Sequence, residues 1–181
     1  WDRWTTDLAP RMAGFIGATG GVTTDARAVL IARFESAHAA RPNADQPDQG
    51  SWWPETVKGA LADPQVLETA EVTLHGGQGW EQARFVQVMR AQTRDRHRFE
   101  ALETEMTPLF MQLRPDLLAA YRAWFPDGSV AAIDYFTSEA DARAGEQKEM
   151  PDVLRERFRE WMSLLDNLEW FDLTDPWMAT P

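Results

Sequence analysis

Asp134 is the residue whose type and position most directly suggest chemistry. It lies in the apolar run 130–136, where strand alternation places its side chain on the same face as Ala132 and Phe136. A carboxylate in such a run is costly to bury unless it meets solvent, an arginine or a cavity. Asp134 is therefore either half of a surface salt bridge or a pocket carboxylate that acts as a base or ligand anchor.

Gln87 and His75 are the other two candidates for acid–base chemistry or ligand anchoring. Val86 and Val88 share one face of an expected strand over 84–91, and Gln87 lies on the other face. We expect the two valines to face the helices, which leaves Gln87 inside a barrel or cavity; exposure at a sheet edge is the alternative. His75 ends another expected strand, where it is either a catalytic group or a half-solvated strand-end side chain.

The remaining histidines and the lack of cysteine argue against a metal centre. His38 and His97 complete the set of three histidines, and no pair has the spacing of a metal motif. His97 lies in a charged run, and both of these side chains are expected on the surface. The chain has no cysteine, which excludes disulfides, thiolate nucleophiles and cysteine zinc sites. We expect no metal and no cofactor.

Composition limits the classes of partner. The chain has 181 residues and a formal net charge of −11, which disfavours phosphate backbones, so we expect no nucleic acid as partner. No apolar run is long enough to span a membrane and no leader is visible, so we expect a cytoplasmic protein without a membrane partner. Nine tryptophans and nine phenylalanines should fill a core, with a few left to line a pocket.

The first part of the chain predicts the element order αββαβ. Residues 1–12 have apolar side chains at helical spacing, and residues 14–23 and 28–34 form a predicted hairpin. Ser36 is a plausible cap for a short helix to about residue 41. A polar loop, a helix over 52–61 and an alternating strand over 67–74 follow.

The second part predicts the order βαββαβ, which is a ferredoxin-like unit. The expected strands cover residues 84–91, 117–125, 130–136 and 170–173. The two main expected helices cover residues 98–113 and 151–165, and Ser138 caps a short helix between strand and helix.

The two parts repeat one another. Phe34-Glu35-Ser36 recurs as Phe136-Thr137-Ser138, with similar residues on both sides. We expect a first repeat over 1–76, a linker over 77–83 and a second repeat over 84–181. Alignment of the repeats predicts that a strand equivalent to 84–91 precedes Trp1; the alternative is that the first sheet is one strand short.

With these features the chain resembles the dimeric α/β-barrel superfamily, which includes antibiotic-biosynthesis-monooxygenase-like proteins. Arg33-Phe34-Glu35-Ser36 and Tyr135-Phe136-Thr137-Ser138 carry the resemblance as aromatic-x-Ser signatures at the ends of strands. It implies an α+β fold in which two ferredoxin-like βαββαβ repeats of one chain form a pseudo-dimeric α/β barrel, the first repeat lacking its first strand. The protein would then be a monomer or a weak homodimer.

The resemblance also implies a cavity for a small hydrophobic, aromatic metabolite. The reaction would be a cofactor-independent monooxygenation or a cyclisation, with a non-catalytic ligand-binding or structural protein as the alternative and haem binding as a third. The expected ligand-binding residues are aromatic: Phe34, Phe136, Trp52, Trp53 and Tyr135. Asp134, His75 and Gln87 would supply the polar groups. Family members often have tryptophan where this chain has Phe34 and Phe136, and phenylalanine offers stacking surface without an N–H donor.

Overall fold

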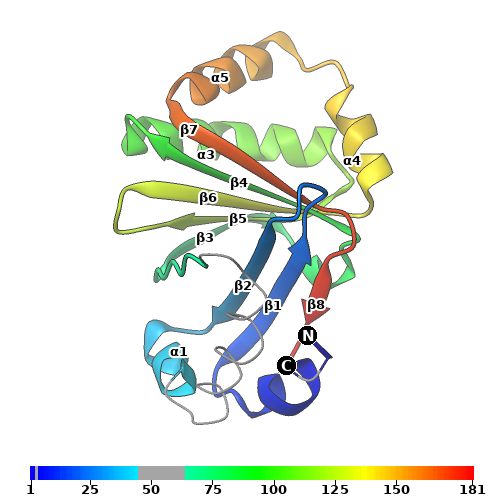
Figure 1. Ribbon diagram of the computed structural model, residues 1–181. Helices are drawn as coiled ribbons and strands as arrows, with labels where there is room; N and C mark the ends of the chain where they lie inside the picture. The colour runs from blue at the N-terminus through cyan, green and yellow to red at the C-terminus, as the bar shows by residue number, and fades with distance from the viewer. Residues whose placement is uncertain (3, 45–63) are drawn as a thin grey trace. The chain divides into compact units, whose positions relative to one another are not determined.

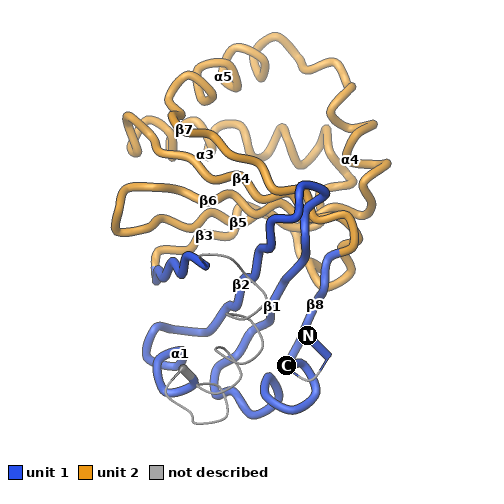
Figure 2. The backbone as a smooth tube through the Cα atoms, in the orientation of Figure 1, with its two compact units in different colours: residues 1–70, 176–181 blue, residues 71–175 orange. Residues whose placement is uncertain are grey.

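The computed structural model describes residues 1–2, 4–44 and 64–181, which form two compact units (Figures 1 and 2). Unit 1 comprises residues 1–70 and 176–181, and unit 2 comprises residues 71–175. The predicted helix over 52–61, with Trp52 and Trp53, lies outside the described residues.

Unit 2 is built on a five-stranded antiparallel sheet with the strand order β3-β5-β6-β4-β7. The strands are β3 (Glu71–Gly77), β4 (Phe85–Thr93), β5 (Leu117–Trp124), β6 (Ser129–Phe136) and β7 (Leu165–Leu173). The last four, with the helices between them, follow the predicted βαββαβ order, and β3 adds a fifth strand beside β5. A 3₁₀ turn, η4 (Trp80–Gln82), joins β3 to β4.

Helices α3 (Arg96–Leu113) and α5 (Asp152–Ser163) cover one face of this sheet, and α4 (Glu139–Glu146) lies near one end of the strands (Figure 1). Asp95 caps α3 by accepting a hydrogen bond from the backbone of Arg98, as Ser138 caps α4 by accepting one from Asp141. The core between sheet and helices consists of ten buried side chains: Met89, Ala91, Phe99, Leu102, Met106, Trp124, Val130, Ala132, Leu154 and Trp161.

The packing of β4 corrects one expectation. Met89 and Ala91 belong to the core under the helices, so the face of β4 that also carries Gln87 is the helix side. Val86 and Val88 are buried on the opposite face of the sheet. The prediction that the valines face the helices was wrong, because β4 contributes Met89 and Ala91 to the core beneath α3 and α5.

Unit 1 has a three-stranded antiparallel sheet with the order β2-β1-β8. Its strands are β1 (Phe15–Val22), β2 (Ala28–Phe34) and β8 (Trp177–Ala179), and α1 (Ala37–Ala44) follows β2. The predicted helix over 1–12 is instead a π-helical turn, η1 (Trp4–Leu8), followed by a 3₁₀ turn, η2 (Ala9–Arg11). Pro10 lies in this 3₁₀ turn, and a proline has no N–H to continue a regular helix.

The two hairpins have the same register. Phe15 pairs with Phe34 in β1–β2 and Leu117 pairs with Phe136 in β5–β6, and a bulge follows the first residue of each strand pair. Each hairpin has a further strand on the outer edge of its first strand, β8 in unit 1 and β3 in unit 2. Residues 71–74, expected in the last strand of the first repeat, thus pair with β5 of unit 2.

Candidate functional site

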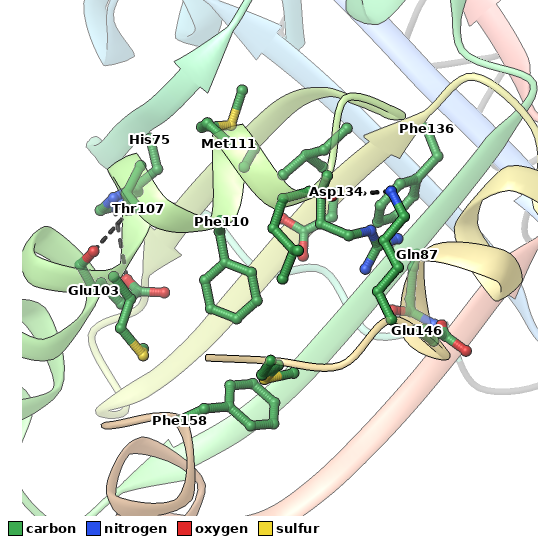
Figure 3. Close-up of a pocket in the computed structure, with 18 of the residues that line it drawn as sticks. His75, Gln87, Glu103, Thr107, Phe110, Met111, Asp134, Phe136, Glu146 and Phe158 are labelled. Atoms are coloured by element: carbon green, nitrogen blue, oxygen red, sulfur yellow. Dashed lines mark hydrogen bonds and ion pairs between the residues drawn. The ribbon is translucent and has the colours of Figure 1, made fainter. Parts of the chain in front are cut away.

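A cavity of about 560 Å³ lies in unit 2 between the sheet and the helices (Figure 3). Its floor is the helix-facing side of all five strands. Its walls are α3, α4, α5 and the segment between α4 and α5. The lining residues that matter below are His75, Gln87, Glu103, Phe110, Arg122, Asp134, Phe136, Arg143, Phe158, Trp161 and Asp172. This volume falls within the range of about 300–1,000 Å³ that is usual for small-molecule sites.

The structure brings together four of the residues singled out from the sequence. His75, Gln87, Asp134 and Phe136 come from β3, β4 and β6, and all four line this cavity. In Figure 3, His75 and Glu103 lie toward one side of the view, with Gln87 and Phe136 toward the other.

The other expected ligand-binding residues lie elsewhere. Tyr135 is buried on the opposite face of β6 from Asp134, where its ring packs edge-on against Tyr121 and Trp80. Phe34 belongs to unit 1, where it packs against Phe15. Neither residue lines the cavity of unit 2.

Arg122 is the centre of a charged cluster on the cavity floor. Its Nε donates to Oε1 of Glu103 at 2.6 Å, and its Nη1 donates to Oδ1 of Asp134 at 2.8 Å. The side chain of Arg122 is 13% exposed, that of Glu103 is 5% exposed and that of Asp134 is 22% exposed. Burial disfavours the charge on Arg122, but the two carboxylates outweigh burial and raise the pKa of its guanidinium. Asp134 thus has the arginine that its position in the strand required.

His75 lies beside the second oxygen of Glu103. Its Nε2 is 3.6 Å from Oε2 of Glu103, and this oxygen accepts no hydrogen bond within the described part of the chain. Burial lowers the pKa of His75 below its ordinary value, and the nearby positive charge of Arg122 lowers it further, while Glu103 opposes both effects. His75 is therefore a neutral imidazole at pH 7 with a carboxylate next to it.

Gln87 takes part in a second polar cluster at the cavity wall. Its Nε2 donates to Oδ1 of Asp172 at 3.0 Å, and the other oxygen of Asp172 accepts from Arg143 of α4. Arg143 also pairs with Glu146 at 3.0 Å. The hydrogen bond to Asp172 raises the pKa of Arg143, and this effect, together with the nearby carboxylates, outweighs burial, which lowers the pKa. Gln87 is thus an anchor for β7 and α4 rather than a group with a free proton to exchange.

The rest of the lining is apolar and aromatic. Phe110 of α3 packs edge-on against Phe158 of α5, with ring centroids 5.9 Å apart, and Phe158 stacks on Trp161 at 5.7 Å. Flat side chains at the wall favour a flat ligand, because ring faces and edges pack well against one another. The cavity therefore combines an aromatic wall with a floor that carries His75, Glu103, Arg122 and Asp134.

Sequence reasoning missed Glu103 and Arg122, although each leaves a signal. Glu103 lies one helical turn from Phe99 and from Met106, on the otherwise apolar face of α3. Arg122 is the charged residue of β5, and its side chain lies on the same face of the strand as Ala120 and Trp124. A charge on the inward face of both a helix and a neighbouring strand is the pattern of a buried ion pair.

Among the residues with described placement, no group of three or more acidic, histidine or cysteine side chains is arranged to hold a metal ion. No helix within the same ranges is long and apolar enough to cross a membrane. The exposed positions of His38 and His97 agree with the expectation that both lie on the surface.

Comparison of the structure with solved structures finds matches along the whole chain. A crystal structure of a "putative monooxygenase" from Lactobacillus acidophilus NCFM matches with a TM-score of 0.73 and 14% identity, over 99% of this chain and 85% of the other. One of a "putative monooxygenase" from Fusobacterium nucleatum matches with a TM-score of 0.75 and 7% identity, over 99% and 84%. An "anthrone oxidase-like protein" matches with a TM-score of 0.66 and 9% identity, over 99% and 84%.

No family model matches the sequence, and no curated protein matches it. At such low identity, the likeness to solved structures establishes the fold and not the reaction. The chain has an α+β fold with two antiparallel sheets, of the dimeric α/β-barrel type found in monooxygenase-like proteins.

Proposed function

We propose that the cavity of unit 2 binds a small, flat, largely apolar aromatic metabolite and catalyses its cofactor-independent oxygenation. The observation that carries the proposal is the position of His75, whose Nε2 lies 3.6 Å from Oε2 of the buried Glu103 in a cavity with an aromatic wall. The names of the structural neighbours, two of them "putative monooxygenase" and one "anthrone oxidase-like protein", support the same class of reaction.

His75 acts as the general base in this proposal. It removes a proton from an acidic C–H or phenolic O–H of the ligand, and Glu103 stabilises the resulting imidazolium through its adjacent Oε2. Arg122 holds Glu103 in place through the other oxygen of that carboxylate. A base with a neutral starting state suits a cavity in which an isolated charge would be poorly solvated.

The ligand anion itself supplies the electrons for oxygen chemistry. A delocalised aromatic anion transfers one electron to O₂, the two radicals combine at carbon, and the resulting peroxide takes up a proton. Loss of water then leaves a carbonyl, so that a CH₂ group and O₂ give C=O and H₂O. The aromatic wall would exclude bulk water from the reactive anion.

Oxygen uptake tests this function. Anthrone, which carries one activated CH₂ group between two rings, is incubated with the protein in air-saturated buffer, and anthraquinone is detected by mass spectrometry. We expect His75→Gln to lower the rate by about 10²-fold to 10⁴-fold, as for loss of a general base. His97→Gln, which changes an exposed histidine at the start of α3, should leave the rate unchanged.

The same experiment separates catalysis from binding alone. Anthrone that binds without oxygen uptake above the background rate would indicate a ligand-binding protein. Equal rates for wild type and His75→Gln would show that His75 is not the base.

A further inference from the structure

The outer edge of β2 in unit 1 has no partner strand among residues 1–2, 4–44 and 64–181. The sheet has the order β2-β1-β8, so only one side of β2 is paired, the side that faces β1 (Figure 1). The ladder between these two strands starts where the backbone N–H of Thr23 donates to the carbonyl of Arg27. Because the direction of bonding alternates along an antiparallel strand, the N–H and C=O groups of Leu30 and Ala32 point away from β1.

Apolar side chains beside this edge are also uncovered. Phe34 packs against the core of unit 1, and alternation places Leu30 and Ala32 on the same face of β2. Leu30 is 36% exposed, and Ala32 is exposed as well. An edge strand with open backbone groups and exposed apolar side chains is a template for pairing with another strand.

Unit 2 shows what covers the equivalent edge. The hairpins β1–β2 and β5–β6 have the same register, so β6 corresponds to β2 and Ala132 to Leu30. In unit 2 this edge is paired with β4 in antiparallel register, and Met89 lies opposite Ala132. Ala132 is only 2% exposed. A strand in the place of β4 is therefore what the sheet of unit 1 lacks within the described residues.

The chain around Trp1 lies close to this edge. Three apolar side chains that pack in the core of each unit share one spacing and align in order: Trp1, Trp4 and Leu8 with Phe99, Leu102 and Met106. A Cβ built on Gly20 would lie 3.2 Å from the ring of Trp1 and 2.7 Å from Leu30, so Trp1 lies on the β2 side of the sheet. In unit 2, β4 ends at Thr93, six residues before Phe99.

We propose that the outer edge of β2 binds an extended strand of the same polypeptide, encoded upstream of Trp1, in the antiparallel register that β4 has with β6. This strand covers the positions from fourteen to six residues before Trp1, as Phe85–Thr93 precede Phe99. It carries apolar side chains on the face that it shares with Leu30. The short link to Trp1 favours this strand over one from a second copy, because a tethered strand has a high effective concentration at the edge. The inference is independent of the proposed reaction.

Cysteine crosslinking in the intact protein tests both the strand and its register. Residues 1–181 contain no cysteine, and any cysteine encoded upstream is replaced by serine. The test variant carries Ile31→Cys together with a cysteine eleven residues before Trp1. These two positions correspond to Ile133 and Val88, which lie opposite each other in β6 and β4. The Cα atoms of such a pair are about 4.5 Å apart, which is within the span of a disulfide.

A matched control carries the same Ile31→Cys with a cysteine ten residues before Trp1. One step along a strand turns the side chain to the other face of the sheet, so this pair cannot meet. After oxidation with copper phenanthroline, we expect an intrachain disulfide in the test variant and its loss in the control. Non-reducing electrophoresis and peptide mass spectrometry measure the crosslink.

Hydrogen exchange gives a second readout that needs no substitution. If the strand pairs with β2, the outward-pointing amides of Leu30 and Ala32 are hydrogen-bonded in the intact wild-type protein and exchange slowly. We expect them to be protected as strongly as the equivalent amides of Ala132 and Asp134, which face β4. Fast exchange of Leu30 and Ala32 in the intact protein would overturn the proposal even if the cysteine variants fail to fold.

The crosslinking outcomes also distinguish the possible occupants of the edge. A disulfide-linked dimer in place of the intrachain product would show that a second copy supplies the strand, and the proposal would be wrong. Equal crosslinking in the test and control variants would overturn the register. A coding sequence with no segment of this length upstream of Trp1 would overturn the proposal outright.

Discussion

Nη1 of Arg122 lies 2.8 Å from Oδ1 of Asp134, across the antiparallel strands β5 and β6. Since Arg122 also binds Glu103 of α3, this one side chain joins the sheet to the helix layer at the cavity. Removal of Arg122 would leave two carboxylates facing each other without a counter-charge in a poorly solvated site.

We therefore predict that Arg122→Met lowers the free energy of unfolding by about 3–5 kcal/mol, as measured by urea denaturation. Arg94→Gln, which removes an ion pair between exposed side chains, should have little effect. Addition of Glu103→Gln and Asp134→Asn to Arg122→Met should restore much of the stability. A mild effect of Arg122→Met alone would show that water reaches and solvates this cluster.

His75 gives a prediction about pH. Burial holds its pKa below the ordinary value of 6.5, so between the folded and unfolded pKa values the unfolded chain binds more protons. The contribution of His75 to stability is complete above pH about 6.5 and is lost as the pH falls through the folded pKa. Urea denaturation between pH 5.0 and 7.5 should show a shallower fall in stability for His75→Gln than for wild type. His97→Gln should follow the wild-type curve, and identical curves for all three proteins would contradict the low pKa.

Two glycines with similar backbone angles should differ in their tolerance of alanine. Gly77 has a φ of 77°, and a Cβ there would lie 1.8 Å from the carbonyl oxygen of Leu118. Gly128 has a φ of 81° and open space around it. We predict a cost of about 1–2 kcal/mol for Gly128→Ala, from the left-handed backbone alone. Gly77→Ala should cost several times more, because β3 must move away from β5. Thermal denaturation of both variants measures the difference, and equal costs would show that the edge strand shifts freely.

Ser36 and Ser138 occupy equivalent places in the two parts of the chain and offer a test of their local similarity. The hydroxyl of Ser36 accepts from the backbone of Ala39 at 3.1 Å, and that of Ser138 accepts from Asp141 at 3.1 Å. Replacement of either serine by alanine should cost about 1 kcal/mol, the usual value of an N-terminal cap. Urea denaturation measures both, and an effect at only one serine would mean that the two helices differ in their dependence on the cap.

The sequence predicted the order of elements in unit 2 because each of them has a clear period. Apolar residues at helical spacing predicted α3 and α5, and two segments on either side of the turn Pro126-Asp127-Gly128 predicted the hairpin of β5 and β6. The three-residue strand β8 was not predicted, because three residues are too few to show an alternation of apolar and polar side chains. The closing strand was predicted over 170–173 and covers 165–173, since the last turn of α5 ends at Ser163 rather than at Leu165.

The candidate site was predicted in part. Asp134 was identified because a carboxylate within an apolar strand needs a partner, and its partner is Arg122. The valines of β4 were predicted to face the helices and lie on the other face instead, but Gln87 still lines the cavity, because the cavity lies on the helix side of the sheet. Glu103 and Arg122 were not identified, because helix and strand patterns place side chains inward without indicating which buried charges pair with one another.

The sheet of β1 and β2 takes its edge strand β8 from the end of the sequence, and the sheet of unit 2 takes its edge strand β3 from the segment before β4. This arrangement affects where the chain could be divided into two fragments. A fragment that begins at residue 84 would lack β3, and β5 would then expose an unpaired backbone edge. A fragment that ends before residue 177 would in the same way leave β1 without β8. Two polypeptides divided before residue 84 would therefore each need the other to complete a sheet.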